Sequence, residues 1–166
     1  SLGIEIFKTG KNGVVTMRPC LDSQMLYVGT GDQKTVYALD AQSGGVNWQS
    51  QLPAAIVASI AAGEGRAYVP CQDSTVYALD KIGGNLLERI PQANAVTSPI
   101  LVNPVDDILY TATQSDVFAY APDTGNELSY EVGSDPYLLG TNASDVYVGG
   151  GQRVYSINFT EVLKQF

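Results

Sequence analysis

Apolar and polar residues alternate over short stretches of the chain, which is the period-two pattern of half-buried β-strands. The clearest stretch begins with two such segments, residues 26–30 and 35–39, joined by a polar, glycine-containing connection typical of a hairpin. A second turn runs from Asp40 to Gly44, and Trp48 follows four residues after that glycine. The stretch therefore predicts strand, hairpin, strand, tight turn and the start of a third strand.

The same pattern returns at an interval of about 40 residues. Its turn glycines, Gly3, Gly44, Gly84 and Gly125, are 41, 40 and 41 residues apart. A period near 40 with four strands in each unit is the signature of a β-propeller, in which every unit forms one blade. We therefore expect an all-β fold, a propeller of four four-stranded antiparallel blades, with residues 1–166 forming a single domain.

The phase of the repeat indicates how the ring would close. The first unit lacks its first three strands and the last unit lacks its outermost strand, which residues 4–8 would supply if the two ends meet. Three forms remain open: a complete four-bladed ring, half of an eight-bladed propeller completed by a second copy, and an excerpt of a longer chain. The first strands of the following units are expected at residues 14–19, 55–60 and 95–100.

Charge and composition exclude several classes of partner. The chain has 17 acidic and 9 basic residues, a net charge of −8, which disfavours nucleic acid and anionic membrane surfaces. No apolar run approaches the ~20 residues of a membrane-spanning helix. The two cysteines, Cys20 and Cys71, occupy different positions in neighbouring units, and we expect two idle thiols rather than a disulfide.

Few residues of the sequence are suited to catalysis. The chain has no histidine, the commonest general base, and no adjacent pair of cysteines. Asp40 and Asp80 each precede a glycine turn, where a carboxylate accepts hydrogen bonds from backbone N–H groups, so they are expected to cap turns rather than to hold a metal. The sequence thus predicts no catalytic, cofactor-binding or metal-binding residue.

Residues 37–48 read Tyr-Ala-Leu-Asp-Ala-x-Ser-Gly-x-x-x-Trp, and this stretch resembles the repeat of the quinoprotein, or pyrroloquinoline quinone (PQQ) type, β-propellers. Weaker copies begin at Tyr77, Phe118 and Tyr155. The resemblance implies that Trp48 packs between blades. Some members of the family are dehydrogenases that hold the quinone and a metal. Another is a lipoprotein scaffold of the bacterial outer-membrane assembly machinery that only binds protein, and this likeness implies an extracytoplasmic compartment.

These observations favour a non-catalytic binding or scaffold module that has no cofactor. The alternative is a fragment or relic of a PQQ-dependent dehydrogenase. The expected partner is another protein or a small ligand at a propeller face, or a second copy if the chain is half of a larger ring.

Recognition in propellers falls to loops, because the blades use their apolar residues to pack against each other. Two loops exceed what a tight connection needs, residues 29–34 and 103–107, and the acidic doublet of the second is expected to be solvated. Arg18 is also a candidate binding residue, because the predicted first strand would place it at the central channel. The candidate binding residues are Arg18, Gly31, Asp32, Asn103, Val105, Asp106 and Asp107.

Overall fold

The computed structural model describes residues 13–15, 17–133, 135–159 and 163. This part of the chain contains fifteen strands in four antiparallel sheets, which confirms the predicted all-β repeat. No helix within it is long and apolar enough to cross a membrane.

Each sheet takes its strands in chain order. The first blade consists of β1 (Cys20–Asp22), β2 (Met25–Thr30), β3 (Thr35–Asp40) and β4 (Val46–Gln51). The second consists of β5 (Ala61–Ala62), β6 (Arg66–Cys71), β7 (Thr75–Asp80) and β8 (Leu86–Pro91). The third consists of β9 (Leu101–Val102), β10 (Leu109–Ala112), β11 (Asp116–Ala121) and β12 (Asn126–Glu131). The fourth has three strands in the described part, β13 (Tyr137–Thr141), β14 (Asp145–Gly150) and β15 (Arg153–Asn158).

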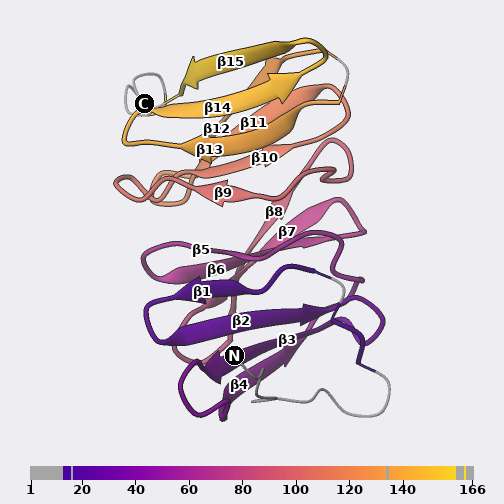
Figure 1. The fold of residues 1–166 in the computed structure, drawn as a ribbon, viewed down its shortest axis with the longest axis vertical. Coiled ribbons are helices and arrows are strands. Elements are labelled where there is room, and N and C mark those ends of the chain that lie inside the picture. Colours follow the sequence, from indigo (N-terminus) through magenta and orange to yellow (C-terminus); the bar gives the residue numbers. More distant parts are fainter. Residues whose placement is uncertain (1–12, 16, 134, 160–162, 164–166) are drawn as a thin grey trace, which may run out of the picture.

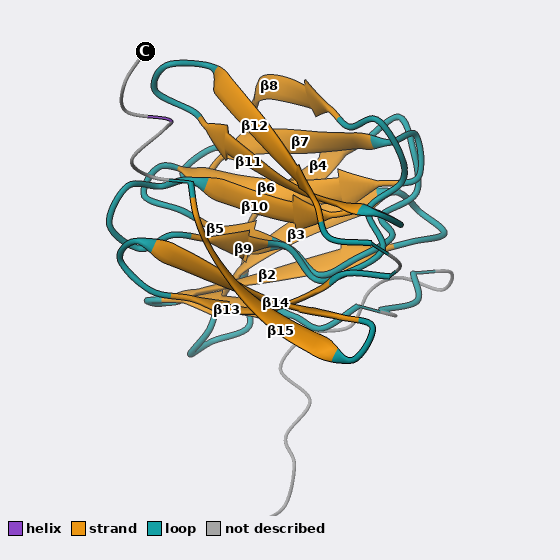
Figure 2. Cartoon of the chain, turned by 90° about the horizontal axis from the view of Figure 1, so that it is seen from above, coloured by secondary structure: helices purple, strands orange, loops and turns teal. Residues whose placement is uncertain are grey.

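The blades follow one another along the long axis of the molecule. The inner strands are neighbours in the order β1, β5, β9 and β13, with β4 at the bottom of Figure 1 and β15 at the top. Figure 2 shows the same stack from above, with β8 and β12 at the outer edges of the second and third blades. The predicted closing strand, residues 4–8, lies outside the described residues, and the described sheets do not show that closure.

Aspartates stabilise the turns between the third and fourth strands. Asp40 Oδ1 accepts hydrogen bonds from the Ser43 backbone N–H and hydroxyl, both at 2.7 Å. Asp80 accepts from the N–H groups of Ile82 and Gly83, each at 3.1 Å. The prediction that these carboxylates cap turns is confirmed.

Apolar side chains from adjacent blades form a cluster at each of the three junctions. At the first junction Trp48 is buried, its ring centroid 5.9 Å from that of Tyr27, and its indole N–H donates to the Lys81 carbonyl at 2.9 Å. Trp48 therefore packs between blades, as the resemblance implied. At the second junction Glu88 takes its place, and the Glu88 carboxylate accepts a hydrogen bond from the hydroxyl of Tyr120.

The inner strands begin later than predicted in three blades. Residues 14–19, 55–60 and 95–100 were expected to form strands, but β1, β5 and β9 begin only at Cys20, Ala61 and Leu101. Residues 55–60 form only one isolated bridge to β6. Residues 55–60 and 95–100 cross from one blade to the next before they join the sheet, so their alternating pattern reflects packing between blades rather than strand pairing.

Arg18 consequently precedes the inner strand on which it was predicted to lie. It is exposed and precedes β1, with Pro19 next in the chain. A proline has no N–H to donate to a strand ladder, which explains why the sheet starts after it. In the third blade the corresponding residue, Ser98, is buried, and its hydroxyl oxygen accepts from the N–H of Leu138 at 3.4 Å.

Candidate functional site

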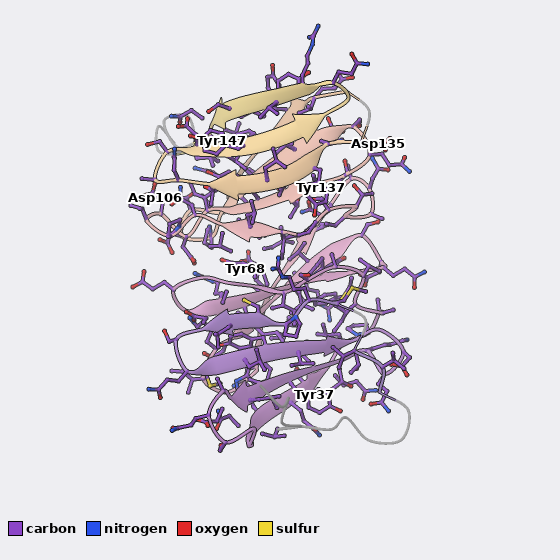
Figure 3. The ribbon with its side chains drawn as sticks, viewed as in Figure 1. Tyr37, Tyr68, Asp106, Asp135, Tyr137 and Tyr147 are labelled. Carbon is purple, nitrogen blue, oxygen red and sulfur yellow. The ribbon has the colours of Figure 1, made fainter. Side chains whose placement is uncertain are left out.

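The loops lie on two opposite faces of the stack. We call face A the side with the β1–β2, β5–β6, β9–β10 and β13–β14 turns, and face B the side with the β2–β3, β6–β7 and β10–β11 turns. Asp106 lies on face A, at the left of Figure 3. Gly31 and Asp32 belong to the β2–β3 turn, and Arg18 comes before β1, so all three lie toward face B. The structure therefore does not gather the predicted residues into one surface.

Asn103 organises the loop between β9 and β10. Its side chain is buried, and Oδ1 accepts from the backbone N–H groups of Val105 at 2.8 Å and Asp106 at 3.3 Å. Its side-chain amide donates to the carbonyl of Ala143 at 3.3 Å, and the backbone N–H of Asp107 donates to the carbonyl of Asn103 at 3.1 Å. The asparagine thus holds the loop in one conformation and ties it to the fourth blade.

Asp107 attaches the same loop to the second blade. Its Oδ1 accepts from the N–H of Glu64 at 2.8 Å, and Oδ2 accepts from the Tyr68 hydroxyl at 3.3 Å. Arg66 lies 3.7 Å from the same carboxylate. The approach requires glycine at position 63, because a β-carbon on Gly63 would lie 1.8 Å from Oδ1. The expectation that this acidic doublet is solvated is therefore wrong for Asp107.

Burial dominates the electrostatics of this contact. It raises the pKa of Asp107 above the usual carboxyl range, against the opposing effects of the Glu64 N–H, the Tyr68 hydroxyl and the Arg66 guanidinium. Burial also raises the pKa of Tyr68, so its hydroxyl remains a hydrogen-bond donor at neutral pH. The loop is therefore held by a donor–acceptor network rather than by an exposed ion pair.

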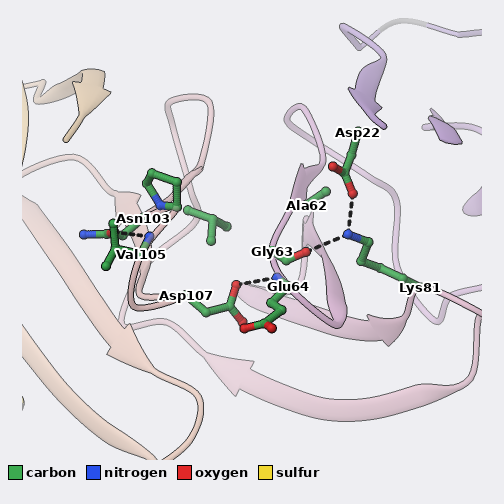
Figure 4. A pocket seen from close by; sticks show the side chains of 10 residues that line it. Asp22, Ala62, Gly63, Glu64, Lys81, Asn103, Val105 and Asp107 are labelled. Atoms are coloured by element: carbon green, nitrogen blue, oxygen red, sulfur yellow. Dashed lines mark hydrogen bonds and ion pairs between the residues drawn. The ribbon is translucent and has the colours of Figure 1, made fainter. Parts of the chain in front are cut away.

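Lys81 makes the corresponding connection between the first and second blades. Its ammonium group donates to the Asp22 carboxylate and to the Gly63 carbonyl, the latter at 2.7 Å (Figure 4). This role could not be predicted from the repeat, because the equivalent residues of the first and third units are Ala41 and Pro122. A lysine in a polar turn is ordinarily a solvated residue.

The β9–β10 loop forms a ridge between two hollows on face A. One hollow has a volume of about 450 Å³ and the other about 350 Å³. Glu64, Val105 and Asp107 line both. Val105 is 65% exposed, so the ridge presents an apolar tip held in place by buried polar contacts.

Acidic side chains outnumber basic ones around this ridge. The acidic residues that line the two hollows are Asp22, Glu64, Asp106, Asp107 and Asp123, and the lysine that lines them is Lys81. Nowhere in the described part of the chain do three or more His, Cys, Asp or Glu side chains form a group that could hold a metal ion. The arrangement is suited to binding a partner with an apolar anchor and basic neighbours.

Comparisons with known proteins agree with the fold. The model of the family described as outer membrane protein assembly factor BamB matches residues 7–165. No curated protein matches the chain. The crystal structure of the computationally designed Ika4 protein is similar at a TM-score of 0.75 and 17% identity, covering 95% of this chain and 99% of that one. BamB from Moraxella catarrhalis is similar at a TM-score of 0.53 and 18% identity, covering 88% of this chain, which spans 62% of the BamB chain.

Proposed function

Because the chain belongs to the family of the outer membrane protein assembly factor BamB, to which it matches over residues 7–165, we propose that it is a non-catalytic β-propeller that binds another protein. The family name supplies the class of role, an assembly factor. The partner would occupy face A.

The observation that carries this proposal is the Val105 ridge. An exposed apolar tip costs little to bury, and its loop is already ordered by Asn103 and Asp107, so binding need not pay for ordering it. The hollows on either side leave room for partner side chains. Acidic groups around them favour lysine or arginine on the partner.

The proposal that the protein is not an enzyme is supported by the whole sequence. It contains no histidine, and its two cysteines, Cys20 and Cys71, are 51 positions apart in the chain. A binding role needs neither a general base nor a redox pair.

Photo-crosslinking tests the proposed surface directly. A photoreactive phenylalanine analogue in place of Val105 should capture a partner that the same group at Leu87, an exposed apolar position on β8, does not capture. With the purified partner, Val105→Asp should weaken binding by about tenfold or more, roughly 1.4 kcal/mol, while Leu87→Asp leaves it unchanged. Equal effects of the two substitutions would exclude face A as the binding surface.

A further inference from the structure

The junction between the second and third blades contains a hollow of about 310 Å³. It lies between the segment that ends β8 and the outer strands β11 and β12 of the third blade, all of which Figure 2 shows. None of its lining residues lines the two hollows beside the Val105 ridge, so it is a separate feature. The lining residues that matter here are Gln92, Thr113, Asp116, Phe118, Glu127 and Ser129.

The second blade shows what covers the equivalent place in the preceding unit. Tyr77 and Phe118 begin corresponding copies of the repeat, and Tyr77 pairs with Arg89 as Phe118 pairs with Ser129. In the second blade the guanidinium carbon of Arg89 lies over the Tyr77 ring, 5.9 Å from the ring centroid. In the third blade Ser129 is too short to cover Phe118, and both residues line the hollow. The third blade therefore keeps the aromatic ring but has no arginine over it.

The charge of the hollow favours a cation. Asp116 and Glu127 line it, and no lysine or arginine among the described residues does. Neither carboxylate takes part in an ion pair with another described residue, although Asp116 accepts a hydrogen bond from the Ser115 hydroxyl. The second blade has Thr75 where the third has Asp116, so this negative charge is particular to the third blade. A cation over the Phe118 ring would be attracted by the ring face and by both carboxylates.

The buried wall of the hollow carries an oxygen that no donor of the described chain occupies. Thr113 is 3% exposed, and its hydroxyl has no hydrogen-bond partner within the described residues. Its backbone groups are satisfied, since the N–H donates to the Asp116 carbonyl at 2.9 Å and the carbonyl accepts from the Thr97 hydroxyl at 3.0 Å. A buried hydroxyl without a partner is destabilising. A ligand that donates hydrogen bonds would relieve this cost.

We propose that this hollow binds an arginine side chain of a protein partner, with the guanidinium over the Phe118 ring and between the carboxylates of Asp116 and Glu127. A guanidinium has five N–H donors, no acceptor and a planar face, so one group serves the ring, both carboxylates and the Thr113 oxygen. A lysine would meet the carboxylates but would stack less well on the ring. The site does not use the Val105 ridge, so it is independent of the proposed function.

Titration of the ¹⁵N-labelled protein with N-acetyl-arginine methylamide, followed by NMR, tests the site. The backbone N–H signals of Gln92, Thr113 and Ser129 should shift and saturate in the millimolar range, as expected for a single side chain. The matching citrulline derivative has the same shape without the charge and should give no saturable shift. Equal binding of the two probes would overturn the proposal. So would arginine-induced shifts of the same size around Asp22 and Asp123 on face A, because they would show only a general attraction to acidic groups.

Substitutions then test the individual contacts. Ser129→Arg should abolish binding of the arginine probe, because the chain itself then supplies the arginine that Arg89 supplies in the second blade. Glu127→Gln should weaken binding by about threefold or more, whereas Glu131→Gln, an exposed position on the same strand that does not line the hollow, should change it by less than about twofold. Unchanged affinity in Ser129→Arg or in Glu127→Gln would overturn the proposal.

Two further variants separate this site from the rest of the molecule. Thr113→Val should weaken binding of the probe without lowering the urea midpoint of unfolding, because the hydroxyl has no partner to lose. A lower midpoint would mean that the hydroxyl already has a structural role. Val105→Asp should leave the affinity for the probe unchanged even where it abolishes partner binding at face A. Loss of probe binding in Val105→Asp would contradict a separate site.

Discussion

The indole of Trp48 lies against Gly84 of the next blade, so close that a β-carbon on Gly84 would lie 2.4 Å from Cε3 of the ring. Gly84 also has φ of 70°, a left-handed conformation that favours glycine. Gly125 occupies the same turn position with φ of 72°, yet a β-carbon there would meet nothing within 4 Å. The two glycines thus separate the conformational requirement of the turn from the close approach of the ring.

Gly84→Ala should destabilise the protein more than Gly125→Ala. Both substitutions place alanine in the left-handed conformation, which costs on the order of 1 kcal/mol. Only Gly84→Ala also forces the new methyl group into a buried ring, which adds roughly 1–3 kcal/mol. Urea unfolding monitored by circular dichroism measures both losses. Equal losses of stability would mean that the Trp48 ring moves away from the new methyl group without destabilising the protein.

Removing the ring should relieve the overlap. Trp48→Ala alone should cost about 3–5 kcal/mol, since it empties a buried site and breaks the hydrogen bond to the Lys81 carbonyl. In that background Gly84→Ala should cost only its conformational part, so the double mutant is more stable than the sum of the single losses predicts. Additive losses in the same unfolding assay would contradict direct contact.

Asp107→Asn should change how stability depends on pH. Burial raises the pKa of Asp107, so the folded state holds its proton to a higher pH than the unfolded state. The resulting stabilisation is present below the unfolded pKa and is lost as pH rises through the folded pKa. The stability of the variant relative to wild type should therefore increase from about pH 3 to neutral. Urea unfolding across that range would refute the idea if the difference moved the other way, because attraction to Arg66 would then dominate.

Asp40→Asn provides the opposite control. Hydrogen bonds from the Ser43 backbone and hydroxyl lower the pKa of Asp40. Its stabilisation is therefore present above the unfolded pKa and is lost as pH falls through the folded pKa. The variant should lose stability relative to wild type as pH rises over the same range.

The two thiols should differ in their reactivity. Both cysteines are free, but Cys71 is fully buried and burial raises its pKa to about 12, so it holds almost no thiolate at pH 8. Cys20 is half-buried, and burial also raises its pKa. With Ellman's reagent, the Cys71→Ser variant should be labelled at Cys20 while the protein stays folded. The Cys20→Ser variant should be labelled at Cys71 only at the rate of unfolding. Rapid labelling of Cys71 in the absence of urea would contradict its burial.

We expect no tight binding of pyrroloquinoline quinone with Ca²⁺. The sequence lacks histidine and an adjacent cysteine pair, the groups most often found against a quinone or metal. Titration followed by absorbance and thermal shift should show no saturable site. A dissociation constant in the micromolar range or tighter, roughly −8 kcal/mol, would instead favour the dehydrogenase relic.

The repeat and its turns could be predicted because their signals are local. Alternation within a strand, an aspartate two or three residues from the N–H groups it caps, and glycine at a left-handed turn all depend on neighbours within about one hairpin. For the same reason Asp40, Gly44 and Trp48 were assigned correctly from one stretch of sequence. The start of each inner strand was not, because residues 55–60 and 95–100 alternate for packing between blades.

The candidate site depends on contacts between residues that are far apart in the chain. From the sequence, Asp107 is expected to be a solvated acidic residue in a loop. Its carboxylate instead accepts a hydrogen bond from the N–H of Glu64, 43 positions away, because the propeller brings the β5–β6 and β9–β10 turns together. Tyr147 and Tyr27 occupy the same position in their units, and no feature of the neighbouring sequence distinguishes a buried tyrosine from an exposed one. Tyr27 is buried against the second blade, whereas Tyr147 is 37% exposed in the described part of the chain. Neighbouring residues thus determine the strands and turns, whereas the burial of a side chain depends on which blades are adjacent in the tertiary structure.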